Sequence, residues 1–313
     1  MNYPLRQDKD MDLIVILGAT ATGKTELAAN LAYRIGTEII SADSRQVYRR
    51  MDLGTGKDYQ DYMVQGREIP SHLIDIADPG YKYSVFEFQR DFLNAYHDIR
   101  NRGMIPILCG GTGMYIEAIL NGYKLLPVPP DPGRRTELGK KSMEELKNML
   151  ASISSLHNTT DLNHKKRLIR AIEISEYNIN NNQSEKEFPV LKAIIFGVKF
   201  DRDSRRRRIT ERLKKRLESG MIEEVRELLK TVPAEDLIYY GLEYKYLTLF
   251  CMGKINTDEL FSGLNTAIHQ FAKRQMTWFR KMEKEGHRIY WLDGYMNLEE
   301  KISKVLSAIS QSN

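Results

Sequence analysis

A segment near the start of the sequence has the residue types and the spacing of a phosphate-binding loop. It follows the apolar run 13–17 and consists of Gly18, Ala19, Thr20, Ala21, Thr22, Gly23, Lys24 and Thr25. In such a loop the glycines allow a tight turn, so that backbone N–H groups and the start of the next helix point at one anion. Lys24 adds a positive charge, and the hydroxyl of Thr25 can bind Mg²⁺. The pattern predicts chemistry on a phosphorylated substrate.

The carboxylate that many kinases and nucleotide hydrolases use to hold magnesium is not evident after the next long apolar run. In those enzymes an aspartate ends a second apolar strand. Here the run 105–108 continues into Cys109, Gly110, Gly111 and Thr112, and the substitute Asp75 follows a short apolar stretch. The sequence therefore disfavours an ATP-driven motor or switch. It leaves open any reaction in which a pyrophosphate must be bound.

Two polar residues that follow apolar runs could take part in that chemistry. Asp43 follows the run 38–42, and Thr112 follows the run 105–109. In an open α/β sheet, ligands bind beyond the carboxyl ends of the strands, so both side chains are expected near the phosphate-binding loop. A carboxylate there can act as a general base. Aspartate and threonine are also good helix caps, and the sequence alone does not decide between the two roles.

A strongly basic segment follows later in the chain. Between Arg202 and Arg216 it has nine Lys or Arg residues and two acidic ones. Helical spacing places on one face the residues Arg205, Arg208, Arg212 and Lys215. Such a face suits a polyanion or a leaving pyrophosphate, although a solvated helix surface is the simpler alternative. More basic residues occur in the region 123–188, which strengthens the prediction of a polyanionic partner.

The elements that must position these residues alternate between strand and helix patterns. Strands are predicted at 13–17, 38–42, 72–76, 105–109, 193–200 and 288–292, and helices at 26–33, 86–102, 203–219 and 263–285. This order predicts an α/β fold of the P-loop NTPase-like type, with a mainly parallel sheet flanked by helices. A proline-rich connector near 125–132 precedes a region without strand patterns. We therefore predict a catalytic core of residues 1–122 and 189–313, with a helical insertion domain at 123–188.

Composition bears on the compartment in which the protein works and on the kinds of site it can form. The 313 residues carry a net charge of +5, and the two cysteines argue against a disulfide framework or a cysteine-rich zinc site. The apolar runs are far too short to span a bilayer, and the polar N-terminus does not resemble a signal peptide. We expect a cytoplasmic protein that has no membrane association. Nothing in the sequence predicts a stable protein partner.

An ordered set of motifs runs along the sequence. The motifs lie at 18–25, 41–48, 51–55, 72–76, 110–112, 167–173, 220–225 and 271–278, which together span most of the chain. In this order they resemble the tRNA dimethylallyltransferases, also called tRNA isopentenyltransferases, in their bacterial form. Each motif is weak by itself, but the ordered set is highly specific. The resemblance implies transfer of a dimethylallyl group from dimethylallyl diphosphate to the exocyclic amine of the adenosine on the 3′ side of the anticodon in tRNA. Mg²⁺ is the implied cofactor.

The resemblance also assigns roles to individual residues. The phosphate-binding loop with Lys24 would hold the diphosphate, and Thr25 would lie near Mg²⁺. Asp43 would accept a proton from the amine, and Thr112 and Arg212 would lie near the reacting centre. Contacts to the tRNA anticodon stem-loop are implied for Asp43, Ser44, Arg45, Gln46, Thr112, Arg135, Lys166, Arg167 and Arg170.

The chain departs from the family pattern in a few places. The family commonly has Gly-Thr-Ala-Lys-Pro where this chain has Gly54, Thr55, Gly56, Lys57 and Asp58. In a second departure, the usual Gly-Tyr-Arg/Lys reads Gly-Leu-Glu-Tyr-Lys at residues 241–245. Three alternative functions remain open at this stage: an ATP-dependent small-molecule kinase, a non-catalytic RNA-binding module, and a transferase that prenylates free adenine nucleotides.

Overall fold

The fold was analysed in a computed structural model that describes residues 11–153, 164–180 and 188–311. The N-terminal segment before residue 11 lies outside the described residues. The polar residues at 178–184 predict a loop, of which 181–184 also lie outside them, while 178–180 are helical. The chain divides into two compact units. The core unit comprises Met1–Gly122 and Val190–Asn313, and the insertion unit comprises Tyr123–Pro189. The predicted boundaries at 123 and 188 lie within one residue of this division.

A six-stranded parallel sheet forms the centre of the core unit, with the strand order β5-β2-β6-β1-β7-β8. The strands are β1 (Leu13–Gly18), β2 (Ile39–Ser41), β5 (Ser71–His72), β6 (Ile107–Gly110), β7 (Ala193–Lys199) and β8 (Ile289–Asp293). β1 is buried along its whole length, as its uninterrupted apolar sequence requires for a strand covered on both faces. The sheet confirms the predicted fold class.

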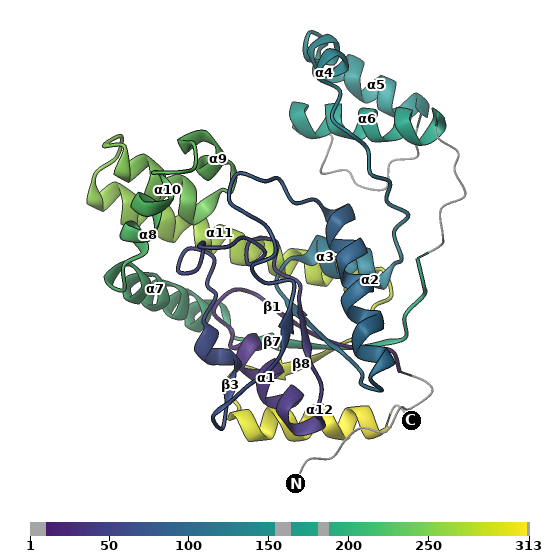
Figure 1. Cartoon of the computed structure of the whole chain (residues 1–313), viewed down its shortest axis with the longest axis vertical. Helices are drawn as coiled ribbons and strands as arrows, with labels where there is room; N and C mark the ends of the chain where they lie inside the picture. The colour runs from purple at the N-terminus through teal and green to yellow at the C-terminus, as the bar shows by residue number, and fades with distance from the viewer. Residues whose placement is uncertain (1–10, 154–163, 181–187, 312–313) are drawn as a thin grey trace. The chain divides into compact units, whose positions relative to one another are not determined.

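Helices cover the sheet on both sides (Figure 1). On one side α1 (Lys24–Ile35) packs with the C-terminal helix α12 (Leu298–Gln311) over alternate residues of the strands. The helices α2 (Val85–Asn101), α3 (Gly113–Leu120) and α11 (Thr257–Lys284) pack with one another on the other side. Capping boxes at Ser84 and Asn256 fix the starts of α2 and α11.

The remaining helices of the core unit lie between β7 and α11 in the sequence. They are α7 (Arg202–Glu218), α8 (Met221–Leu228), α9 (Ala234–Tyr239) and α10 (Leu242–Cys251). α7 is the predicted basic helix, and it buries Ile209 and Leu213 as its apolar stripe requires. Both α7 and α10 pack against α11. Between β2 and β5 lie a short 3₁₀ helix, η1 (Tyr59–Tyr62), and a small hairpin of β3 (Met63–Val64) and β4 (Arg67–Glu68).

The insertion unit is helical in its described part. It contains α4 (Pro132–Gly139), α5 (Met143–Ile153) and α6 (Lys165–Asn180). Its own core consists of Leu138, Leu146, Leu150, Leu168, Ile169 and Ile172. Because this unit has a separate apolar core, its helices are stabilised by packing against one another. None of the helices in the described part of the chain combines the length and apolar character that crossing a bilayer requires.

Three sequence-based expectations are wrong in detail. The strand predicted at 72–76 ends after His72, because Leu73 and Asp75 adopt left-handed backbone conformations with φ of 61° and 55°. The extended connector predicted up to Pro132 gives way to α4, which starts at that proline with Asp131 as its N-cap. The helix predicted at 263–285 begins six residues earlier, at Thr257.

Candidate active site

The predicted phosphate-binding loop joins β1 to α1 at the carboxyl edge of the sheet. A Cβ on Gly18 would lie 2.7 Å from the Thr22 Oγ1 atom, so a larger residue would displace the loop. Gly23 has a φ of +77°, which glycine adopts at little cost. Ala21 has a φ of 63°, a conformation that costs a non-glycine residue free energy. The hydroxyl of Thr22 donates to the Ala19 carbonyl at 2.9 Å and stabilises the turn from within.

Lys24 begins α1 and lies among charged groups. Burial lowers the pKa of Lys24, while the Asp43 carboxylate nearby favours its charged form and the guanidinium groups of Arg212 and Arg216 oppose it. The same surroundings therefore bring together a carboxylate, an ammonium and two guanidinium groups. This charge arrangement suits an anionic group placed close to a carboxylate that can accept a proton.

Asp43 follows β2 in a turn formed by residues 44–47, and not at the start of a helix. Its Oδ1 atom accepts a hydrogen bond from the Arg45 backbone N–H at 3.0 Å. This short-range contact fixes the side chain while the residue stays half-buried. The helix-cap alternative for Asp43 is therefore wrong, and the carboxylate is available for chemistry.

Thr112 occupies the N-cap position of α3, yet its hydroxyl does not bond to that helix. The Thr112 Oγ1 atom instead accepts from the Ser44 backbone N–H at 3.0 Å, and the Thr112 N–H donates to the Ala42 carbonyl at 3.2 Å. A Cβ on Gly110 would lie 2.2 Å from that same carbonyl oxygen, so glycine is needed where the two loops meet. The loops after β2 and β6 are thus joined beside the phosphate-binding loop.

Gln275 on α11 connects the phosphate-binding loop to the loop after β6. Its Oε1 atom accepts from the Thr20 N–H at 2.9 Å, and its Nε2 atom donates to the Gly111 carbonyl at 2.8 Å. The side chain is buried, so both hydrogen bonds are shielded from water. Gln275 lies in the family-like motif at 271–278, but this role was not predicted. No local pattern could have shown it, since the three segments are far apart in the sequence.

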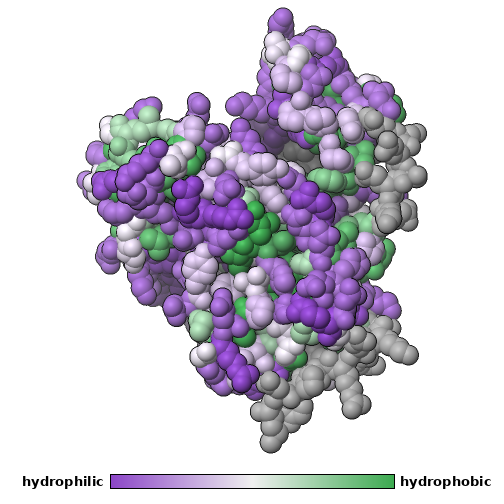
Figure 2. Space-filling model, viewed as in Figure 1, coloured by the Kyte–Doolittle hydropathy of each residue, from purple (hydrophilic) through white to green (hydrophobic). Residues whose placement is uncertain are grey.

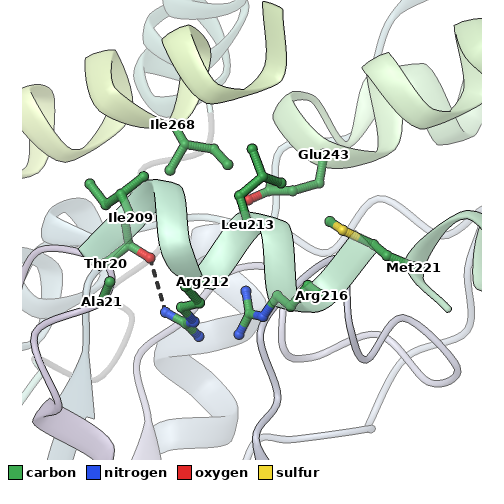
Figure 3. A pocket seen from close by; sticks show the side chains of 9 residues that line it. All are labelled: Thr20, Ala21, Ile209, Arg212, Leu213, Arg216, Met221, Glu243 and Ile268. Atoms are coloured by element: carbon green, nitrogen blue, oxygen red, sulfur yellow. Dashed lines mark hydrogen bonds between the residues drawn. The ribbon is translucent and has the colours of Figure 1, made fainter. Parts of the chain in front are cut away.

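The basic face of α7 contacts the phosphate-binding loop directly. Arg208 donates from Nε to the Ala21 carbonyl at 2.9 Å, and Arg212 donates from Nη1 to the Thr20 hydroxyl at 3.2 Å. Figure 3 shows Arg212 and Arg216 projecting from the same side of α7, next to a pocket whose apolar wall includes Ile209. Arg216 was not among the predicted site residues, although its position four residues after Arg212 places it on that face.

Comparisons with known proteins decide the family. The IPP transferase family model matches residues 46–282, and an isopentenyl transferase model matches residues 11–69. The protein named tRNA dimethylallyltransferase 2 from Bacteroides fragilis is 59% identical over 96% of this chain and 99% of its own length. This chain belongs to the IPP transferase family.

Solved structures agree with this assignment. The tRNA isopentenylpyrophosphate transferase from Bacillus halodurans shares 30% sequence identity with a TM-score of 0.69, covering 96% of each chain. A eukaryotic dimethylallyltransferase acting on tRNA matches with a TM-score of 0.73 at 22% identity, over 91% of this chain and 74% of the other. At that lower identity the likeness shows a shared fold.

The segment 51–58, which ends in the unusual residues Gly56 to Asp58, is held in place by charged groups. The Glu224 carboxylate accepts from the backbone N–H groups of Asp52, Leu53 and Gly54 at 2.7–3.1 Å, and from the Tyr244 hydroxyl at 2.7 Å. This segment is therefore anchored to α8 and α10.

The buried ammonium group of Lys57 binds acidic residues on both sides of it. It pairs with Asp52 at 2.9 Å and with Asp75 at 2.5 Å. The Tyr59 hydroxyl also donates to Asp75, at 2.6 Å. Asp75, which the sequence analysis considered as a substitute metal ligand, is therefore engaged in fixing this segment.

The residues expected to contact tRNA near Asp43 are partly engaged within the protein. The Gln46 side chain donates from Nε2 to the Gly56 carbonyl at 3.1 Å. The Arg45 guanidinium lies 5.8 Å from the centre of the Tyr240 ring, in cation–π geometry. Ser44 presents its backbone N–H to Thr112. These contacts orient the turn and leave its outer atoms half-exposed.

In the insertion unit, the basic residues expected to contact tRNA fall into two groups. Arg135 forms two hydrogen bonds of 2.8 Å with Glu173, and Arg170 pairs with the same carboxylate at 3.0 Å. Although burial opposes it, these hydrogen bonds lower the pKa of Glu173. Lys166 and Arg167 are instead exposed on α6. Thus two of the four residues hold the unit together, and the other two face solvent.

The donors available for magnesium are few on the protein side. In residues 11–153, 164–180 and 188–311 no group of three or more His, Cys, Asp or Glu side chains could hold a metal ion. The half-buried Thr25 hydroxyl is the first oxygen of α1 beside the loop. Magnesium often binds with one or two protein ligands, together with substrate phosphate oxygens and water. This donor set fits an ion that arrives with a diphosphate.

Proposed function

We propose that this chain transfers a dimethylallyl group from dimethylallyl diphosphate to the exocyclic amine of the adenosine on the 3′ side of the anticodon in tRNA, releasing diphosphate. The observation that carries the proposal is the hydrogen-bonded junction of the Asp43 and Thr112 loops beside the phosphate-binding loop. This junction supports a proton acceptor at Asp43 beside a diphosphate bound to that loop. The names of the relatives, which act on tRNA or transfer dimethylallyl groups, support the same reaction.

The diphosphate end of the substrate is proposed to bind the phosphate-binding loop. Backbone N–H groups at the start of α1 and the Lys24 ammonium face the anion, and Arg212 reaches the loop through Thr20. When the carbon–oxygen bond breaks, the electron pair leaves with the diphosphate. These positive groups would stabilise the charge that develops there. Magnesium, held through Thr25 and diphosphate oxygens, would neutralise part of the same charge.

The acceptor end of the reaction is proposed to lie at Asp43. The exocyclic nitrogen of adenine forms the new bond to the first carbon of the dimethylallyl group and loses one proton. The Asp43 carboxylate takes that proton, which leaves the prenylated nitrogen neutral. Thr112 is assigned a positioning role, because its hydroxyl fixes the turn that carries Asp43. A base inside a folded anticodon loop must turn outward to reach such a site.

The core unit also offers the apolar surface that a hydrocarbon group requires. Figure 2 shows hydrophobic residues gathered in the middle of the view, with hydrophilic residues around them. A dimethylallyl group gains free energy when it leaves water for such a surface. The insertion unit, with Lys166 and Arg167 exposed, is proposed to contact the anticodon stem-loop through its phosphates.

A direct assay separates this reaction from the alternatives. Purified protein would be incubated with labelled dimethylallyl diphosphate and unmodified tRNA, and in parallel with ATP labelled on its terminal phosphate. We expect label from dimethylallyl diphosphate on one adenosine of the tRNA and no phosphate transfer. Phosphate transfer without prenylation would indicate a kinase, and prenylation of free AMP in preference to tRNA would indicate a nucleotide prenyltransferase.

The Asp43→Asn variant tests the catalytic assignment. It keeps the size of the side chain and its acceptor oxygen but cannot take the proton. We expect kcat to fall by roughly 10² to 10⁴, with unchanged affinity for inorganic pyrophosphate. If this variant retains full turnover, Asp43 is not the base.

A further inference from the structure

Two neighbouring arginines on α7 form a cationic pair at the edge of the phosphate-binding loop. Arg212 and Arg216 are one helical turn apart, and Figure 3 shows their guanidinium groups side by side. Their side chains are 28% and 12% exposed. Burial and then the charge of Arg212 lower the pKa of Arg216 to about 10. Two like charges this close destabilise each other unless an anion lies between them.

That anion is a carboxylate of the chain itself. The Asp58 Oδ2 atom lies 3.1 Å from Arg212 Nη2 and 3.1 Å from Arg216 Nη2, and its Oδ1 atom lies 3.3 Å from the latter. The Asp58 side chain is 44% exposed, so it can turn toward water without disturbing the core. One accessible carboxylate thus neutralises both guanidinium groups.

The backbone before Asp58 is built for this close approach. Gly56 has a φ of +76°, and a Cβ there would lie 2.4 Å from Arg216 Nη2 and 2.5 Å from Arg212 Nη2. The Gly56 carbonyl also lies 3.4 Å from Arg212 Nη2. A side chain larger than hydrogen at position 56 would therefore push the two guanidinium groups away from Asp58.

We propose that Asp58 is an internal anion, which occupies the arginine side of the diphosphate site in the free protein and is displaced when diphosphate binds. This inference rests on the proposed function, which places a diphosphate on the phosphate-binding loop. Arg212 links that loop to Asp58, because it bonds to Thr20 through Nη1 and to Asp58 through Nη2. Competition by Asp58 lowers the affinity for diphosphate and favours its release after transfer.

Calorimetric binding of inorganic pyrophosphate to the full chain tests this inference. We expect Asp58→Asn to bind pyrophosphate about tenfold more tightly than the unmodified protein, which corresponds to about 1.4 kcal/mol. The KM for dimethylallyl diphosphate should fall in the same direction. Unchanged or weaker pyrophosphate binding by Asp58→Asn would overturn the inference, since it would make Asp58 inert or an orienting group for the arginines.

A matched control uses the acid three residues later. Asp61 is close enough for Arg212 and Arg216 to act on its pKa, which burial raises, but no ion pair joins it to them among the described contacts. Asp61→Asn should change pyrophosphate affinity by less than about twofold. An equal gain in both variants would show general charge repulsion and would count against a specific role for Asp58.

Two further variants keep the outcomes separate. Asp58→Ser, with its fold checked by circular dichroism and thermal unfolding, should reproduce the gain if Asp58→Asn folds poorly. Arg212→Ala should lose pyrophosphate affinity. If the unmodified protein binds no pyrophosphate, or if Arg212→Ala binds it equally well, the proposed diphosphate site is wrong. If that site is confirmed and Asp58→Asn changes nothing, the Asp58 inference alone fails.

Discussion

The hydroxyl of Thr112 accepts a hydrogen bond from the backbone N–H of Ser44 at 3.0 Å. Thr112 follows β6 and Ser44 follows β2, which are neighbouring strands of the parallel sheet. The contact joins two loops 68 residues apart and sets the turn in which the Asp43 carboxylate is held by Arg45. A side chain at a helix N-cap is used here to connect loops and not to cap its own helix.

Removing the Thr112 hydroxyl should slow the reaction without weakening pyrophosphate binding. Thr112→Val keeps the shape of the side chain but leaves the Ser44 N–H without its acceptor, so the turn that carries Asp43 loosens. We expect kcat to fall about tenfold, as for the loss of a hydrogen bond worth about 1.4 kcal/mol. Thr112→Ser, which retains the hydroxyl, is the control. If Thr112→Val turns over as fast as Thr112→Ser, the hydrogen bond to Ser44 does not set the rate.

Gln275→Leu should destabilise the protein and impair catalysis together. It removes the buried amide, so the Thr20 N–H and the Gly111 carbonyl are left without their hydrogen-bond partner. We expect the free energy of unfolding to fall by about 2 kcal/mol and kcat to fall at least tenfold. Chemical denaturation and steady-state kinetics measure the two effects. Thr277→Ala, an exposed change on the same helix, should leave both quantities unchanged, and a catalytically normal Gln275→Leu would refute the positioning role.

Glu38 should stabilise the fold in a pH-dependent manner. Although burial opposes it, hydrogen bonds from Arg102 and His72 lower the pKa of Glu38, with Arg102 Nη2 at 2.9 Å and His72 Nε2 at 2.7 Å. A carboxyl group with a lowered folded-state pKa stabilises the fold above its unfolded-state pKa of about 4.3, and this stabilisation disappears as the pH falls through the lower folded-state value.

Glu38→Gln should therefore cost about 2 kcal/mol of unfolding free energy at pH 7, and the difference from the unmodified protein should shrink below about pH 4. Urea unfolding at a series of pH values measures this. Glu68→Gln, a change of an exposed acid on β4, serves as the control and should show no such trend. A difference that stays constant with pH would mean that the effect of Glu38→Gln comes from packing.

In the insertion unit, Lys166→Ala and Arg170→Ala should have different effects. Lys166 is exposed and forms no ion pair with any residue that the structure describes. Its loss should therefore weaken tRNA binding about two- to fivefold and reduce the slope of log affinity against log salt by about one. Thermal stability should not change. Arg170 pairs with Glu173 and donates to the Val128 carbonyl at 2.7 Å, so Arg170→Ala should also lower the melting temperature. Identical behaviour of the two variants would contradict the division of roles.

Much of the fold followed from local patterns in the sequence. β1 and β7 are continuous apolar runs, and α7 has a clear apolar stripe, so each could be identified without knowledge of its neighbours. The strand expected at 72–76 failed because its backbone responds to distant partners. Asp75 turns into a left-handed conformation while its carboxylate binds Lys57. The helix α4 was not predicted, because its first residue, Pro132, ends a proline-rich segment that resembles a connector.

The parts of the candidate site that lie in one continuous segment could be predicted from the sequence. The parts that depend on hydrogen bonds between distant segments could not. The phosphate-binding loop, Asp43 and Thr112 each follow a strand, so topology alone brings them together. Gln275 and Glu224 act through partners more than 150 residues away, which no local pattern reveals. The structure also shows that Arg135 and Arg170 both pair with Glu173. Their residue type alone predicts a positive charge and does not predict that partner.

The hydrogen bond from Thr20 to Gln275 also bears on when the protein becomes active during its synthesis. The two residues are 255 positions apart in the chain. At about 5–20 residues per second, the ribosome makes the phosphate-binding loop roughly 13 to 50 seconds before it makes the side chain that fixes it. A nascent chain therefore carries the complete loop sequence without the group that holds it in shape. We therefore expect activity only after Gln275 has been synthesised and has reached the loop.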